Sequence, residues 1–197
     1  MPQHPLLSKK HWVFDMDGTL TIAQHDFDAI RAELGLPEGL PILESLDQLP
    51  PEEASQLHIR LNQIELEVAH QSRPAEGAKQ LLEFLTSNDA RIGIVTRNNA
   101  HNIDITLKAA GLADYFLPEN LLSRECAPPK PSPAGILGLL ASWGAKSDDA
   151  VMVGDHLHDL LSGRAAGVAT IYVDSSEEYP FKNNADVCIR RLTELRE

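Results

Sequence analysis

Two aspartates separated by one residue follow a short apolar stretch near the beginning of the sequence. The stretch Trp12 to Phe14 predicts a buried strand, and Asp15 and Asp17 come directly after it. Carboxylates this close repel each other unless a proton or a cation lies between them. Gly18 allows a sharp backbone turn at the same place. This spacing indicates a nucleophile and a general acid arranged around a divalent metal ion. An Asx-type turn is the alternative that involves no chemistry.

Further polar residues follow other apolar runs in the same way. Thr96 ends the run RIGIVT, Lys130 lies in a loop with four prolines, and Asp155 and Asp159 follow the run AVMV and Gly154. In an open α/β sheet, chemistry takes place just beyond the carboxyl ends of the strands. Taken singly, Thr96 is equally a helix cap, Lys130 a solvated loop lysine, and the two acids a cap and a surface charge. Their shared position at strand ends favours one common site.

The elements that must hold these residues alternate between strands and helices. Short apolar runs alternate with helical patterns of about a dozen residues, which predicts βαβ units in a parallel sheet with helices on both faces. We expect strands at 12–14, 91–96, 150–153, 169–173 and 186–189, a short one at 115–117, and helices at 74–87, 98–110, 133–143 and 157–166.

A stretch of about fifty residues interrupts this alternation after the first strand. It shows no strand pattern, and its apolar spacing predicts helices at 25–34, near 42–49 and at 51–71. We therefore expect an α/β core formed by residues 1–20 and 74–197, with residues 21–73 forming a small helical cap.

Four segments of the sequence resemble, in order, the four motifs of the haloacid dehalogenase-like hydrolase superfamily. They are Asp15-Met16-Asp17-Gly18-Thr19-Leu20, Thr96, Lys130 in Lys130-Pro131-Ser132-Pro133, and Gly154-Asp155 followed by Asp159. The resemblance implies that fold, with its Rossmann-like parallel sheet. It further implies that Asp15 is the nucleophile, Asp17 the general acid and base, and Lys130 a catalytic cation. It places Mg²⁺ on Asp15, the backbone carbonyl of Asp17, and Asp155, with Asp159 close by.

The same resemblance implies a Mg²⁺-dependent phosphatase that hydrolyses a small phosphomonoester through an aspartyl-phosphate. A β-phosphoglucomutase-like phosphomutase uses the same residues and is the alternative enzyme. A non-enzymatic phospho-receiver or binding module is less favoured, because receiver domains carry their phospho-acceptor on a later strand. Dehalogenation is disfavoured because dehalogenases of the superfamily lack the acid that Asp17 supplies. The absence of GxGxxG after the first strand excludes a dinucleotide site.

Several residues around these motifs have more open roles. We expect contacts with the substrate phosphate from Thr19, Thr96, Arg97, Asn98 and Lys130. His156 and His158 are expected to face solvent or to support the site, with zinc or manganese binding as the alternative. In the cap, His25, Arg31 and Glu65 are candidate substrate contacts, and ordinary helix-surface polarity explains them equally well.

The overall composition limits the partners. A net charge of −12 argues against broad binding to nucleic acid or to anionic membranes. No apolar run has the form of a signal peptide or a transmembrane helix, and Cys126 and Cys188 form no disulfide framework or zinc pattern. We expect a cytoplasmic protein with reduced thiols and a small phosphorylated metabolite as its partner. The sequence leaves the oligomeric state open between a monomer and a weak dimer.

Overall fold

A six-stranded parallel sheet forms the centre of the protein. The computed structural model describes residues 4–22, 27–37 and 40–196, and within them the strands follow the order β3-β2-β1-β4-β5-β6. All neighbouring strands are parallel. The strands are β1 (His11–Phe14), β2 (Arg91–Val95), β3 (Leu121–Leu122), β4 (Ala150–Gly154), β5 (Ala169–Val173) and β6 (Val187–Ile189). The predicted α/β fold with a Rossmann-like parallel sheet is confirmed.

Helices cover both faces of the sheet, which is why its strands are apolar throughout. Alternate residues of β1 contribute to different layers. Trp12 and Phe14 belong to the core shared with α4 (Ala78–Ser87) and α5 (Ala100–Ala110). Val13 belongs to the core on the other face, with α6 (Ala134–Trp143) and the end of α7 (Leu157–Ala166). β1 therefore lies in the middle of the molecule, between β2 and β4.

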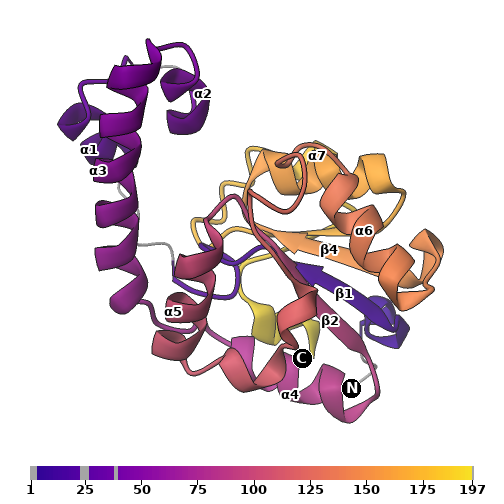
Figure 1. The fold of residues 1–197 in the computed structure, drawn as a ribbon. Helices are drawn as coiled ribbons and strands as arrows, with labels where there is room; N and C mark the ends of the chain where they lie inside the picture. The colour runs from indigo at the N-terminus through magenta and orange to yellow at the C-terminus, as the bar shows by residue number, and fades with distance from the viewer. Residues whose placement is uncertain (1–3, 23–26, 38–39, 197) are drawn as a thin grey trace.

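The remaining three helices lie to one side of the sheet (Figure 1). They are α1 (Phe27–Glu33), α2 (Ile42–Leu46) and α3 (Pro51–His70), and they form an apolar cluster of their own. This cluster joins residues from all three helices, among them Ile30, Leu46 and Leu61. The long helix α3 lies beside α5, which links the group to the rest of the molecule. None of the described helices is long and apolar enough to cross a membrane.

Three predicted elements differ from the structure by more than two residues, among them the helix expected near 42–49, which ends at Leu46. The strand expected at 115–117 is wrong, because Ala113–Tyr115 forms a 3₁₀ turn and the edge strand is the two-residue β3. Pro118, which opens the next 3₁₀ turn, cannot donate to a ladder. The helix expected from residue 74 begins only at Ala78, since Gly77 has φ 86°. A Cβ on Gly77 would also lie 2.5 Å from the backbone nitrogen of Thr193.

Candidate active site

Asp15 lies at the carboxyl end of β1, the point at which side chains from several strands meet. Its backbone N–H donates to the Val153 carbonyl of β4 at 2.8 Å, which continues the ladder by one residue. Carboxylate oxygens of Asp15, Asp155 and Asp159 all lie within 4.8 Å of one another. The fold thus brings together three acids, of which Asp15 and Asp159 are 144 residues apart in the sequence.

Lys130 is the buried cation of this cluster. Its Nζ lies 2.5 Å from Oδ1 of Asp15 and 2.6 Å from Oδ1 of Asp159. Burial alone lowers the pKa of a lysine, but the charges of Asp15 and Asp159 and their hydrogen bonds together outweigh it, so the pKa of Lys130 is raised above its usual value. Lys130 is therefore a permanently charged group between two carboxylates.

Asp155 is held next to the turn that follows β1. The Thr19 hydroxyl donates to Oδ1 of Asp155 at 3.1 Å. Gly18 has φ 89°, and a Cβ at that position would lie 2.3 Å from Oδ2 of Asp155, so only glycine admits this carboxylate. Thr19, predicted to contact phosphate, here uses its hydrogen to position Asp155.

The cluster carries more negative charge than Lys130 can balance. Burial raises the pKa of Asp15 to about 7; the charges of Asp159 and Asp17 act in the same direction, and Lys130 acts against them. Burial also raises the pKa of Asp155, followed by the charges of Asp15 and Asp159. When ionised, three carboxylates beside one ammonium leave two negative charges unbalanced. This oxygen-only donor set fits Mg²⁺, because that ion prefers carboxylate and carbonyl oxygens.

Asp17 is not one of the three clustered acids and has a different hydrogen-bond neighbour. Nδ2 of Asn98 donates to Oδ2 of Asp17 at 3.2 Å. The Asn98 side-chain oxygen accepts from the Asn99 backbone N–H and from Nδ2 of Asn102, which fixes the orientation of the amide. Asn98 thus holds Asp17 by one of its two carboxylate oxygens.

Thr96 and Asp159 also act as local backbone caps. The Thr96 hydroxyl oxygen accepts from the Asn98 N–H at 3.1 Å, which leaves its own hydrogen for a ligand. Oδ2 of Asp159 accepts from the His156 N–H at 3.0 Å, while the His156 ring accepts from the first turn of α7. Asp159 therefore has a partner on each oxygen, Lys130 on one and a backbone amide on the other.

Arg97 follows the end of β2 and contacts both α2 and α7. Its Nη2 lies 2.5 Å from Oε1 of Glu44 on α2, and its Nη1 lies 2.8 Å from Nδ1 of His158 on α7. Burial is the main cause of a lowered pKa for His158, with the charges of His156 and Arg97 acting in the same direction. Arg97 is thus directed toward residues at the margin of the cluster rather than toward Asp15.

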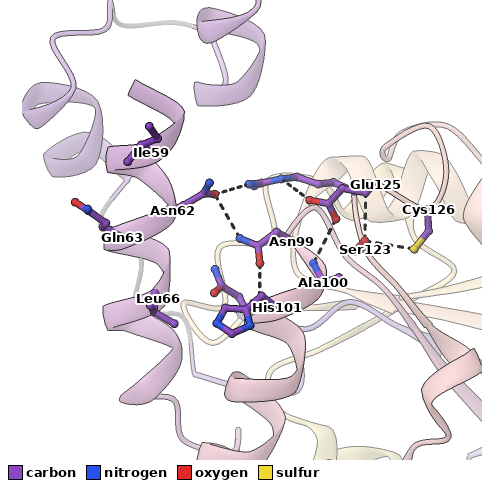
Figure 2. A pocket seen from close by; sticks show the side chains of 12 residues that line it. Ile59, Asn62, Gln63, Leu66, Asn99, Ala100, His101, Ser123, Glu125 and Cys126 are labelled. Carbon is purple, nitrogen blue, oxygen red and sulfur yellow. Dashed lines mark hydrogen bonds and ion pairs between the residues drawn. The ribbon is translucent and has the colours of Figure 1, made fainter. Parts of the chain in front are cut away.

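A second contact joins α3 to the core. Nη1 of Arg124 lies 3.1 Å from Oε1 of Glu65, and Nη2 of Arg124 donates to Oδ1 of Asn62 at 3.0 Å. Figure 2 shows Asn62 of α3 facing Asn99 at the start of α5. A hollow of about 650 Å³ lies beside these residues, and its lining contains none of the clustered acids.

The candidate cap contacts do not come together at the carboxylate cluster. Glu65 pairs with Arg124 at the base of α3. Arg31 pairs with Asp28 and donates to the Leu40 carbonyl, both within its own group of helices. His25 lies outside the described residues. Arg31 thus serves the local structure of these helices.

Sequence reasoning missed Glu44 and Arg124. Both pair with residues more than fifty positions away, Glu44 with Arg97 and Arg124 with Glu65. Neither stands in a motif, and such pairs arise only when α2 and α3 dock on the core. A charged residue directly after Thr96 was the one available signal for the first pair.

Known proteins resemble this chain over most of its length. Residues 12–173 match the profile of the haloacid dehalogenase-like hydrolases. An uncharacterized hydrolase of Saccharomyces cerevisiae is 31% identical over 94% of this chain and 88% of its own. A phosphoglycolate phosphatase of Haemophilus influenzae is 28% identical over 80% and 82%.

The fold is also found in solved structures. The crystal structure of a hydrolase from Pseudomonas syringae superposes with a TM-score of 0.77 at 23% identity, covering 95% of each chain. At this identity the likeness concerns the fold alone, while the profile match covers the four predicted motifs. The predicted family is therefore confirmed: the chain belongs to the haloacid dehalogenase-like hydrolases and is an enzyme of that family.

Proposed function

We propose that this enzyme is a Mg²⁺-dependent phosphatase that hydrolyses a small phosphomonoester through an aspartyl-phosphate on Asp15. The buried contact between Asp15 and Lys130, beside Asp155 and Asp159, carries this proposal. It supplies a carboxylate nucleophile and a fixed cation at one point of the sheet edge. Relatives named phosphoglycolate phosphatase and pyrophosphatase support the same reaction class.

In the first half-reaction, an oxygen of Asp15 attacks phosphorus and the bond to the leaving oxygen breaks. Asp17, held by Asn98 at one oxygen, gives its proton to the leaving oxygen. In the second half-reaction, Asp17 takes a proton from water, whose oxygen attacks the phosphorus. The Asp15 carboxylate is restored and inorganic phosphate leaves.

Lys130 and the metal ligands would control charge during both steps. Lys130 stays protonated and faces both the nucleophile and Asp159. The ligands of Mg²⁺ would be Asp15, the carbonyl of Asp17, Asp155 and Asp159. When bound, the ion would neutralise charge on the carboxylates and the phosphoryl group. Thr96 would donate its hydroxyl hydrogen to a phosphoryl oxygen.

A phosphate-release screen tests this proposal. The panel contains phosphoglycolate, sugar phosphates, p-nitrophenyl phosphate and inorganic pyrophosphate, each measured with Mg²⁺, with EDTA, and with zinc. We expect release from at least one monoester, its loss with EDTA and its return with Mg²⁺. No release from any monoester, or better recovery with zinc than with Mg²⁺, would contradict the assignment.

We further propose that residues 21–73 form a cap whose helices close over this site and select the leaving group. The separate apolar cluster of α1 to α3 and the contact between Glu44 and Arg97 support this division. We also place the enzyme in the cytoplasm, since Cys126 and Cys188 are both free and exposed.

A further inference from the structure

We propose that Arg97 is a specificity-determining residue that binds an anionic group on the leaving-group side of the substrate, in place of the Glu44 carboxylate. This inference rests on the proposed phosphatase function and narrows its substrates to phosphomonoesters with a second anion, such as a carboxylate. Arg97 follows Thr96 directly, so its side chain starts at the strand end where the phosphoryl group is expected.

The first step concerns the charge of Arg97. Its contact with His158 does not neutralise it, because a guanidinium only donates and Nδ1 of His158 must therefore accept as an uncharged nitrogen. Lys130 already faces two carboxylates. Glu44 supplies the carboxylate of the Arg97 ion pair among the described residues. When Glu44 leaves, Arg97 presents an unbalanced cation near the site.

The second step concerns how well Glu44 is held. Oε1 of Glu44 pairs with Arg97, but Oε2 is buried without a hydrogen-bond partner among the described residues. A buried carboxylate oxygen without a partner is unfavourable, since it has lost its hydration. The Glu44 side chain as a whole is 41% exposed, so its pair with Arg97 is not sealed from solvent. Glu44 is therefore a replaceable partner. A ligand carboxylate that offers both of its oxygens to the guanidinium fork binds Arg97 better than Glu44, which offers one.

The third step concerns the charge of the molecule as a whole. A net charge of −12 repels a dianionic or trianionic ester, and the second anion of such an ester needs a cation of its own, because Lys130 and Mg²⁺ are assigned to the phosphoryl group and the carboxylates around it. Arg97 meets this need at the margin of the site. Glu44 belongs to α2, so exchange of partners on Arg97 also couples substrate choice to the position of this helix.

The experiment uses matched pairs of esters with Mg²⁺ and the full chain. Phosphate monoesters of glycolate, 3-hydroxypropionate and 4-hydroxybutyrate are each compared with the monoester of the corresponding diol, which lacks the carboxylate. The readout is the ratio of kcat/KM for acid over diol. Wild type should prefer the acid in at least one pair, and Arg97→Gln should reduce that ratio by about tenfold or more.

Two further variants separate recognition from a structural role. Arg97→Lys should restore part of the ratio, because the charge returns without the fork. Glu44→Gln should change the ratio in the opposite direction, lowering KM for the acid ester, because it removes the competing charge. Arg60→Gln, which removes a surface arginine paired with Glu33, is the matched control and should leave the ratio unchanged.

The outcomes are distinguishable. If wild type hydrolyses these esters but Arg97→Gln lowers acid and diol turnover equally, or no pair shows a preference for the acid, the inference is overturned and the phosphatase function stands. If wild type hydrolyses no phosphomonoester, including p-nitrophenyl phosphate, the function itself fails. Calorimetric binding of phosphonoacetate to wild type and to Arg97→Gln gives an independent readout, and equal affinities would also overturn the inference.

Discussion

Asp15 and Asp17 are two positions apart, and their different surroundings support the different roles proposed for them. Asp15 is 8% exposed and touches Lys130, whereas Asp17 is held by an amide. We expect Asp15→Asn to reduce turnover to background and to yield no phosphoenzyme. Asp17→Asn should keep the nucleophile but slow turnover by about a hundredfold or more, with the largest loss for poor leaving groups.

Acid quenching with labelled substrate, followed by peptide mapping, distinguishes the two roles. The label should appear on Asp15 and nowhere else. Label on Asp17, or steady turnover by Asp15→Asn, would refute the mechanism.

The raised pKa values of Asp15 and Asp155 predict a pH-dependent response to metal. A carboxyl whose pKa is higher in the folded than in the unfolded protein contributes stability that is lost as the pH rises. For Asp15 this stability is lost over the pH range between its ordinary pKa of 3.8 and its raised pKa of about 7. Metal-free protein should therefore lose stability across it, and Mg²⁺ should offset that loss by balancing the carboxylates.

Thermal unfolding with and without Mg²⁺, at about pH 5.5 and about pH 7.5, measures this effect. The rise in Tm caused by Mg²⁺ should be larger at the higher pH, and Asp155→Asn should remove most of it. An equal rise at both pH values would show that these carboxyls are not the groups that bind the ion.

At the scale of elements, the contact between α3 and the core includes one largely buried ion pair. Side chains of Arg124 and Glu65 are 14% and 13% exposed, whereas those of Arg60 and Glu33 are 45% and 46% exposed. Arg124→Ala removes the charged partner of a mostly buried carboxylate, to which Nδ2 of Asn99 still donates at 3.2 Å, and should destabilise the fold by about 2 kcal/mol or more. Arg60→Ala, the exposed control, should cost less than about 1 kcal/mol. Urea unfolding measures both, and equal losses would contradict this role of Arg124.

Elements with a strong local pattern could be predicted from the sequence, whereas contacts between elements could not. β1, β2, β4 and β5 are buried on both faces, so each reads as a short apolar run of limited length. β3 has only two residues and carries no pattern of its own. The motif acids follow predictable strands, which is why their meeting at one edge could be expected.

Other features of the site have no local signature. The ion pair of Arg97 with Glu44 depends on how α2 docks, and the two residues are 53 positions apart. The hydrogen bond from Thr19 to Asp155 likewise joins positions 136 apart. A pattern read along the chain indicates where a polar side chain begins, but the neighbour that it finds is set by tertiary packing.

At the scale of the whole molecule, the chain leaves the core after β1 and returns to it at almost the same place. The Ile22 N–H donates to the Arg73 carbonyl at 3.0 Å, and Thr21 forms an antiparallel bridge with Pro74. The apolar cluster of α1 to α3 shares no residue with the two clusters that cover the sheet. Together these features favour a core that folds without the inserted helices.

Replacement of residues 23–72 by a short glycine-serine linker tests this division. Because the sheet keeps both of its covering layers, the shortened chain should unfold in one cooperative transition, at a lower Tm, since α5 loses its contact with α3. It should retain the rise in Tm caused by Mg²⁺, because all of the clustered acids and Lys130 remain. Discrimination among leaving groups should become weaker, since the cap that is proposed to select them is gone. Circular dichroism melts with and without Mg²⁺ measure the first two effects. A chain without cooperative unfolding would show that residues 21–73 are an integral part of the core rather than a cap.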